Sequence, residues 1–262
     1  MAQMLIFGLG YTASRLAEAL RTRGWHVDAT GSAGNLDFAD EDAVRDALAG
    51  ATHVLSSVPP DREIGLDPVL STYGRGFGTA WYGYLSSTGV YGDQKGAWVD
   101  ETCPTGTGRR SARSQADTKW VELGARVFRL PGIYGPGRSA FERLKEGKAR
   151  RIDMPKDKQR QVFSRCHVDD IVSGVIAGLE APPGAYNLAD DLPASGNAVI
   201  EEACRLSGAA LPPLQSLEEA NLSKMALGFY SENRRVANGK AKRVLNWKPQ
   251  YPTYREGLAS LI

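Results

Sequence analysis

The feature that most constrains this chain is an apolar run that ends in a glycine-rich turn and continues into a helical pattern. Met4-Leu-Ile-Phe7 leads into Gly8-Leu-Gly10, and apolar residues then recur at helical spacing from Ala13 to Leu20. A short apolar run bounded by turn residues indicates a buried strand, and apolar residues three and four apart form one face of a helix. This order predicts the first unit of a sheet that is covered by helices.

The same alternation continues through the first half of the chain. Further strands are predicted at residues 25–30, 53–58, 81–86 and 126–130, with helices between them. Strands that alternate with helices form a parallel sheet. The predicted fold class is therefore α/β, a doubly wound parallel Rossmann sheet with a smaller C-terminal α/β substrate domain.

The alternation loosens from about Gly135, and this change predicts the domain organisation. A Gly-, Arg- and Lys-rich stretch follows, and then one clear helix pattern begins near Ile171 and a short strand near Tyr186. We expect residues 1–135 to form a nucleotide-binding domain, to which about 162–180 return. Residues 136–262 are expected to form a smaller substrate-binding region.

The glycine turn has the composition of a dinucleotide site. Gly8 permits a tight turn, Gly10 lets a pyrophosphate approach the backbone, and Ala13 lets the helix pack closely on the strand. The helix N-terminus adds an anion site. The residues predicted to bind the cofactor here are Gly8, Gly10, Tyr11, Thr12 and Ala13.

The choice between NAD and NADP stays open. An NAD enzyme usually ends its second strand with an acid that binds the ribose hydroxyls. Asp28 falls within the strand, and Thr30-Gly31-Ser32 occupies the strand end, where we expect Ser32 to line the cofactor. No acid at that end would repel a 2′-phosphate, and no arginine follows before Arg45 to bind one.

Composition argues against several other classes of protein. The three cysteines and three histidines of the 262 residues are scattered without metal-ligand spacing, which argues against a disulfide framework and a metal site. We expect no signal peptide, because the first residues lack a basic region, and no apolar run reaches membrane-spanning length. We expect a cytoplasmic protein, a monomer or homodimer, without membrane partners.

Charge is distributed unevenly along the chain. Residues 109–165 carry eleven Arg and five Lys against six Asp and Glu, although the whole chain has a net charge of only +2. An excess of this size points to an anionic partner. A small anionic substrate fits it better than nucleic acid, because the segment lacks interleaved aromatic residues and a helix-turn-helix pattern.

Further motifs follow the glycine turn in a fixed order, and together they resemble the extended short-chain dehydrogenase/reductases, the NAD-dependent epimerase/dehydratase family. The resemblance covers nearly the whole chain and ends near Tyr254-Arg-Glu-Gly257. The motifs are Asp37-Phe-Ala-Asp40, Leu85-Ser-Ser87-Thr-Gly-Val-Tyr91-Gly92, Arg129-Leu-Pro-Gly-Ile-Tyr-Gly135-Pro-Gly137, His167-Val-Asp-Asp170 and Leu245-Asn-Trp-Lys-Pro249.

The resemblance implies a role for individual residues. Asp37 would meet the adenine amino group with Phe38 beside the ring, and Ser87 would take the place of the active-site Ser or Thr. The cofactor would also be lined by Ser57, Val58, Pro59, Pro131 and Ile133.

The chain departs from the family at its catalytic Tyr-x-x-x-Lys pair. No tyrosine occurs from residue 92 to 133, and the best placement puts Arg109 at the Tyr position and Arg113 at the Lys position. Gln115-x-x-x-Lys119 is a rival placement that also lacks the Tyr. Tyr91 and Lys95 match the spacing, but glycines flank them and argue against a helix that would hold both on one face.

This departure shifts the expected chemistry to other residues. Arginine stays protonated, so it is a poor general acid or base but a good ligand for carboxylate and phosphate. Arg113 could still hold the ribose. Catalysis would run through Ser87, Thr88, Tyr134 or a group of the substrate, and the substrate would be bound by Arg109, Arg138, Tyr230 and Arg234.

Three acidic and imidazole groups in the His167 motif are assigned structural roles. Asp169 and Asp170 are expected to cap the helix before Ile171, and His167 is expected to be a structural histidine with satisfied hydrogen bonds rather than a base.

Two functions follow from these residues. The first is an NAD(P)-dependent epimerase/dehydratase-like oxidoreductase that acts on a small anionic or nucleotide-linked metabolite with a degenerate catalytic pair. The alternative is a non-catalytic regulatory protein that senses NAD(P).

Overall fold

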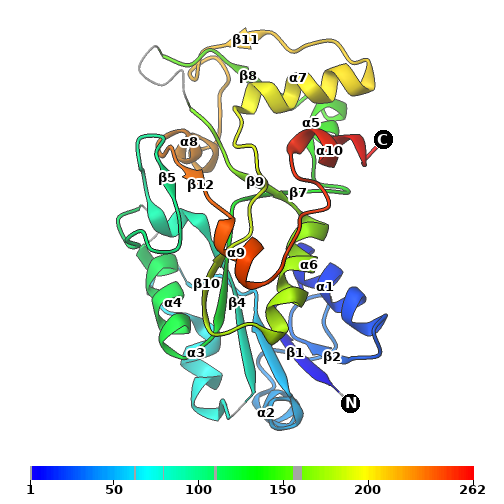
Figure 1. Ribbon diagram of the computed structural model, residues 1–262, viewed down its shortest axis with the longest axis vertical. Coiled ribbons are helices and arrows are strands. Elements are labelled where there is room, and N and C mark those ends of the chain that lie inside the picture. Colours follow the sequence, from blue (N-terminus) through cyan, green and yellow to red (C-terminus); the bar gives the residue numbers. More distant parts are fainter. Residues whose placement is uncertain (1, 62, 79, 109–110, 156–160) are drawn as a thin grey trace.

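A six-stranded sheet forms the larger part of the molecule, in a computed structural model that describes residues 2–61, 63–78, 80–108, 111–155 and 161–262 (Figure 1). Its strand order is β10-β6-β4-β3-β1-β2, and every neighbouring pair is parallel. The strands are β1 (Gln3–Phe7), β2 (His26–Ala29), β3 (His53–Ser56), β4 (Trp81–Ser87), β6 (Arg126–Leu130) and β10 (Gly184–Asn187). The predicted α/β class with a parallel sheet is confirmed.

Helices cover both faces of this sheet because alternate residues of β1 point to opposite sides. Met4 and Ile6 pack with α1 (Tyr11–Arg21) and α6 (Val168–Ala177). Leu5 and Phe7 belong to a second core with the helices of the other face. Those helices are α2 (Glu41–Gly50), α3 (Pro68–Tyr73) and α4 (Ser111–Glu122).

The order of the strands reverses beside β1. The chain runs from β1 outward to β2, and then crosses to β3 on the other side of β1. In parallel α/β sheets, ligands bind outside the carboxyl ends of the strands at this kind of reversal. Residues 8–13 and 57–59 follow the carboxyl ends of β1 and β3, so the fold brings these two predicted segments to one edge.

A smaller layer of helices lies beyond the carboxyl edge of the sheet, at the top of Figure 1. Its core is formed by α5 (Ala140–Lys145), α7 (Gly196–Ser207) and α10 (Tyr254–Ala259). Short strand pairs and helices connect it to the sheet: β7 (Gly132–Tyr134) with β9 (Arg165–His167), β8 (Arg151–Ile152) with β11 (Leu214–Gln215), β5 (Trp98–Val99) with β12 (Arg235–Val236), α8 (Lys224–Tyr230) and α9 (Gly239–Val244).

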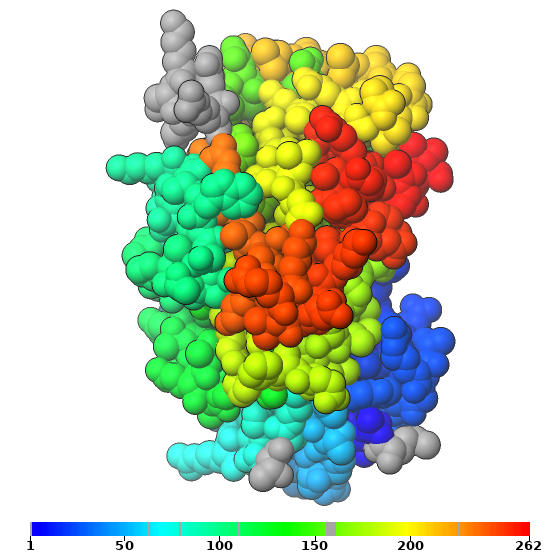
Figure 2. All heavy atoms as spheres, viewed as in Figure 1, coloured from blue at the N-terminus to red at the C-terminus, as the bar shows by residue number. Residues whose placement is uncertain are grey.

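The last part of the chain crosses between the two layers. The segment from α9 to the C-terminus, orange to red in Figure 2, lies across the visible face from the sheet to the upper helices. The chain also returns to the sheet further along than 162–180, because β10 at Gly184–Asn187 completes the sheet beside β6. Among the described residues, no helix combines the length and apolar character needed to cross a membrane.

A buried polar network holds α4 against the sheet. The Asp117 carboxylate accepts two hydrogen bonds from the Arg129 guanidinium, at 3.1 and 2.7 Å, and one from the Ser86 hydroxyl at 2.5 Å. Arg129 also donates to the Tyr91 hydroxyl at 2.9 Å, which donates to Asn187 at 2.8 Å. Burial alone would lower the pKa of Arg129, but its contacts with Asp117 raise it above the ordinary value. The Arg129 guanidinium therefore stays charged inside the protein.

Removing one member of this ion pair should destabilise the fold. Asp117→Ala leaves the Arg129 guanidinium buried without its counter-ion, so we expect the free energy of unfolding to fall by about 3–5 kcal/mol in chemical denaturation. Glu41→Ala is the control, because Glu41 pairs with Arg45 on the surface of α2 and should change stability by about 0.5 kcal/mol or less. Equal effects of the two substitutions would contradict the role given to the buried pair.

Candidate functional site

The glycine turn is fixed between the ends of three strands. Gly8 has a φ of 86°, and a Cβ atom there would lie 2.9 Å from Cγ2 of Val58. Its amide donates to the Thr30 hydroxyl at 3.2 Å, and its carbonyl accepts from the Ser57 hydroxyl at 2.9 Å. Only glycine fits here without displacing the turn after β3. The structure thus brings Gly8, Ser57 and Val58 together.

The first turn of α1 presents free space to a ligand. Gly10 is the N-cap residue and makes no capping hydrogen bond through a side chain, and a Cβ atom at Gly10 would meet nothing within 4 Å among the described residues. Thr12 and Ala13 are buried and anchor this turn on the sheet. The positive end of the helix dipole therefore faces an open space that suits the phosphates of a dinucleotide.

The expected ribose and adenine end lies beyond β2. Phe38 packs edge-on against Phe7 and Tyr73, with ring centroids 6.2 and 5.2 Å apart, so it forms a fixed wall. Asp37 is exposed, and its carboxylate accepts a hydrogen bond from the Ala39 amide at 3.0 Å. Ser32 is exposed as well.

Asp28 is not available at this end, because its carboxylate is already occupied. It accepts a hydrogen bond from the Asn35 amide at 2.8 Å and lies 3.0 Å from Nε2 of His26. Thr30, at the end of the strand, is buried and holds Gly8. The strand end itself, Thr30 to Ser32, therefore carries no acidic side chain that would repel a 2′-phosphate.

Ser87 ends the strand β4 at the same edge of the sheet, and Thr88 follows it. The Ser87 hydroxyl oxygen accepts a hydrogen bond from the Gly89 amide at 3.1 Å, and the short helix η2 (Thr88–Tyr91) follows. This contact fixes the oxygen of Ser87, and its hydroxyl proton has no acceptor within the described part of the chain, so it can be donated to a ligand. Thr88 is only 5% exposed, so its side chain is part of the core of this turn.

Arg113 lies on α4 and reaches back to β4. Its guanidinium donates to the Tyr84 hydroxyl at 2.7 Å and lies 3.5 Å from the Leu85 carbonyl oxygen. Tyr84 is stacked on Trp120, with ring centroids 5.3 Å apart, and burial raises the pKa of its hydroxyl. The Tyr84 hydroxyl thus stays protonated and holds Arg113 beside the strand that ends in Ser87. Arg109 lies outside the described residues.

The tyrosine at the misleading Tyr-x-x-x-Lys spacing has a structural role. The Tyr91 hydroxyl bridges Arg129 and Asn187, and burial raises its pKa to about 12. Lys95 is exposed and has a φ of 50°, in a turn rather than a helix. The two side chains therefore share no face of a helix.

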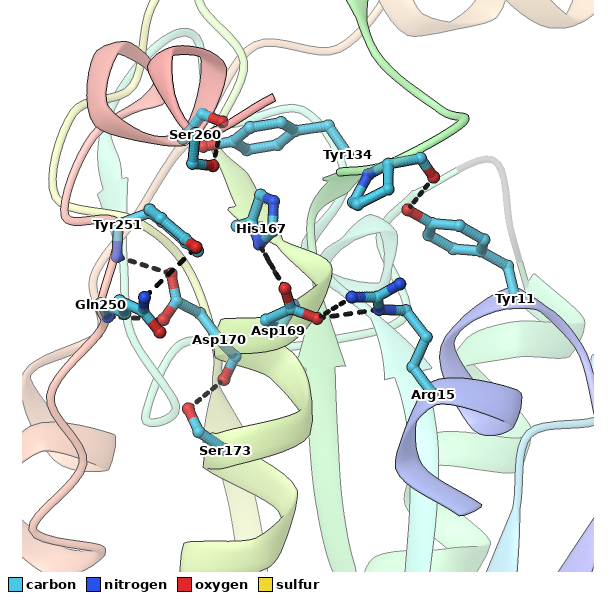
Figure 3. Close-up of polar contacts among 12 residues, drawn as sticks. Tyr11, Arg15, Tyr134, His167, Asp169, Asp170, Ser173, Gln250, Tyr251 and Ser260 are labelled. Carbon is cyan, nitrogen blue, oxygen red and sulfur yellow. Dashed lines mark hydrogen bonds and ion pairs between the residues drawn. The ribbon is translucent and has the colours of Figure 1, made fainter. Parts of the chain in front are cut away.

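Tyr134 turns its hydroxyl toward α10. The hydroxyl lies 3.5 Å from the Thr253 carbonyl oxygen, and a Cβ atom at Gly257 would overlap it. Burial raises the pKa of this hydroxyl, and the ring stands edge-on to His167 at 5.3 Å (Figure 3). The structure thus gives Tyr134 a packing contact with the C-terminal helix, on the side of the upper layer rather than at the end of β4.

Pro131 and Ile133 are the two other predicted residues of the segment that contains Tyr134. Ile133 pairs in register with Cys166 in the β7–β9 ladder and packs on the main core. Pro131 joins β6 to β7 and is half-buried.

His167 and the two aspartates after it correct two predictions. α6 begins at Val168, and its N-cap is His167, whose Nδ1 accepts from the Asp169 amide at 3.2 Å. Nε2 of His167 is buried and has no hydrogen-bond partner among the described residues, so the prediction that this histidine is satisfied is wrong for one of its two nitrogens. Asp169 instead binds Arg15 of α1 at 2.6 Å (Figure 3). The Asp170 carboxylate accepts from the amides of Gln250 and Tyr251. Neither aspartate is the cap, because the helix starts earlier than the apolar pattern suggests.

The predicted substrate residues of the C-terminal half occupy different places. Arg234 donates to the Gly92 carbonyl at 2.7 Å and to Glu232 at 2.9 Å, so it braces the turn after β4. Tyr230 stands edge-on to Phe163 with ring centroids 5.5 Å apart. Arg138 lies over the ring of Tyr11 in α1, with Cζ 5.5 Å from the ring centroid.

Asp190 is a buried carboxyl group that sequence reasoning missed. It is 2% exposed, and neither of its oxygens has a well-formed hydrogen bond among the described residues. Burial raises its pKa to about 8, although the nearby Arg165 and the Leu192 amide favour the charged form. No local pattern marks it, because its burial depends on the return of the chain beside β9.

Two solved structures and one curated protein place this architecture among known proteins. A conserved protein of unknown function from Silicibacter pomeroyi DSS is 41% identical over 100% of this chain and 98% of its own, with a TM-score of 0.84. The UDP-glucose 4-epimerase of Thermus thermophilus, solved with NAD, is 17% identical over 99% and 97% of the chains, with a TM-score of 0.75. The second likeness supports the fold alone.

The curated relative is a Streptomyces protein named 3-diazoavenalumate denitrifying reductase. It is 33% identical over 147 residues, which make up 52% of this chain and 47% of the relative. The chain thus spans about half the length of the curated relative that it matches. No family model matches the chain.

Replacing Asp190 should change how stability depends on pH. When folding raises the pKa of an acid, the folded protein loses stability as pH rises from the unfolded pKa of about 4 to the folded pKa. Asp190→Asn removes this titrating group. We therefore expect the Tm of the variant minus the Tm of wild type to be higher at pH 8 than at pH 5, by about 3 °C or more.

The matched control is Asp46→Asn, which replaces an exposed aspartate of α2. Its Tm should follow that of wild type at both pH values. A constant difference in Tm between Asp190→Asn and wild type across this range would contradict the raised pKa.

Proposed function

The chain belongs to the same family as the conserved Silicibacter pomeroyi protein, and on that premise we propose that it is an oxidoreductase that binds NAD or NADP. The carrying observation is the open first turn of α1 at the reversal of strand order, where Gly10 leaves room for a pyrophosphate. A bound nicotinamide would supply hydride exchange. The fold of the epimerase that was solved with NAD supports the proposal.

The dinucleotide would extend along the edge of the sheet from the Phe38 wall to the loop that contains Pro131 and Ile133. Ser57 and Val58 line the middle of this path, where they meet Gly8. Because no acidic side chain stands at Thr30 to Ser32, this end of the site is compatible with either cofactor.

The substrate proposed is a small anionic or nucleotide-linked molecule. Residues 109–165 carry a net charge of +10, whereas the chain as a whole carries +2. Arg113 is held beside the strand that ends in Ser87, and a guanidinium binds carboxylate and phosphate well. A curated relative that is named as a reductase matches about half of the chain, and this match supports reduction as the reaction.

Within this proposal, Ser87 is the group that would orient the reacting atom of the substrate. Its oxygen is fixed by the Gly89 amide, and its proton has no acceptor among the described residues, so it can be donated. Tyr84 and Tyr91 are unsuited to act as acids, because their hydroxyls are buried, raised in pKa and engaged with arginines. The proton that accompanies the reaction would then come from the substrate or from water.

The same engagement of both tyrosines favours the second candidate function. A protein that keeps the dinucleotide site and lacks the catalytic Tyr-x-x-x-Lys pair could sense NAD(P) without turnover. Binding of the reduced dinucleotide, combined with no oxidation of it across a panel of carbonyl and nucleotide-linked substrates, would favour the sensor over the enzyme.

Gly10→Val tests the proposed site directly. The valine side chain enters the space above α1, and no described protein atom lies within 4 Å of its Cβ, so the fold should be retained. We expect calorimetry to show at least about a hundredfold weaker binding of NADH or NADPH, because the pyrophosphate contacts would be lost.

The control is Gly78→Val, where a Cβ also meets no described atom within 4 Å. It should keep the wild-type affinity. Unchanged binding in Gly10→Val, or no binding in wild type, would contradict the proposed function.

Ser87→Ala tests the orienting role once a substrate is found. Loss of the positioned hydroxyl should lower kcat/KM by about tenfold or more while dinucleotide affinity stays near wild type. Lys95→Ala is the control, since Lys95 is exposed in a turn, and its turnover should stay within about threefold of wild type. Turnover that collapses in Lys95→Ala and survives in Ser87→Ala would contradict this assignment.

A further inference from the structure

The turn that presents Arg138 is fastened to the first residue of α1. Gly135 and Arg138 exchange two backbone hydrogen bonds, at 3.2 and 3.0 Å, and Gly137 between them has a φ of 70°. The Tyr11 hydroxyl donates to the Pro136 carbonyl at 3.0 Å (Figure 3). The backbone of Arg138 is therefore held at a fixed place relative to the N-terminus of α1.

The side chain of Arg138 carries an uncompensated charge at this place. Its Cζ lies 5.5 Å from the centroid of the Tyr11 ring, and the residue is exposed. Among the described residues, its guanidinium makes no hydrogen bond and no ion pair. Arg15, one helical turn further along α1, is instead neutralised by Asp169 at 2.6 Å. Of these two cations, Arg138 is thus the one available to an anionic ligand within the described part of the chain.

The geometry points to Arg138 as a ligand of the dinucleotide pyrophosphate. This inference rests on the proposed function, which places the pyrophosphate over the turn from Gly8 to Ala13. The cation–π contact with Tyr11 holds the guanidinium beside the first turn of α1, and its N–H groups make no hydrogen bond among the described residues. A guanidinium can donate two parallel hydrogen bonds to phosphate oxygens and can add its charge to that of the helix end.

The position of Arg138 separates this role from recognition of a 2′-phosphate. The ribose that carries that phosphate is expected at the end of β2, near Thr30 and Ser32, whereas Arg138 lies at the start of α1. Loss of Arg138 should therefore weaken the binding of NADH and NADPH by the same factor. It should weaken ADP-ribose too, because that probe contains the pyrophosphate without the nicotinamide.

The test measures the Kd of NADH, NADPH and ADP-ribose for Arg138→Gln by calorimetry at two salt concentrations. We expect each Kd to rise about tenfold, the loss typical of one charge-assisted hydrogen bond, and to depend less on salt than in wild type. Arg138→Lys should recover only part of the affinity, because an ammonium group lacks the planar pair of donors.

Arg143→Gln is the matched control, since it removes the same charge from a nearby arginine of α5. It should leave all three affinities unchanged. Wild-type affinity in Arg138→Gln, equal losses in both variants, or a loss confined to NADPH would each overturn the inference. No binding of any probe to the wild-type protein would instead overturn the proposed function.

Discussion

The constraint on which the candidate site depends is the close approach of two loops at the carboxyl edge of the sheet. The chain after β1 and the chain after β3 meet so closely that a single Cβ atom at Gly8 would overlap Val58. Thr30 and Ser57 fasten this contact from both sides with hydrogen bonds to the backbone of Gly8. Because the turn cannot shift, the N-terminus of α1 is aimed at one fixed point in space.

The buried network around Arg129 fixes a second part of this edge, at the end of β4. Asp117 belongs to α4, Ser86 and Tyr91 flank the end of β4, and Arg129 belongs to β6. The ion pair therefore locks a helix to two strands at the level of Ser87. Arg113 lies one helical turn before Asp117, so the same lock determines where its guanidinium meets Tyr84.

Periodicity predicted the strands and helices of the sheet because the pattern of a half-buried element is local. The glycine turn was predicted for the same reason, since Gly8 and Gly10 stand directly between a strand and a helix. The contacts that fix Tyr134 and Asp170 involve residues far away along the chain. Tyr134 is turned by contact with Gly257, and Asp170 is held by the amides of Gln250 and Tyr251. Such partners are far apart in sequence, and no short pattern identifies them.

Because the C-terminal segment crosses between the two layers, contacts at their junction can form only late in synthesis. During synthesis, Asp170 emerges with its helix about eighty residues before the amides of Gln250 and Tyr251 that it binds. Until those residues leave the ribosome, its carboxylate has only water as a partner, and Gly257 cannot yet pack on Tyr134. Contacts this distant in sequence close late, because ordering the intervening chain is costly in entropy. A nascent chain that lacks its last segment would therefore expose the junction between the two layers.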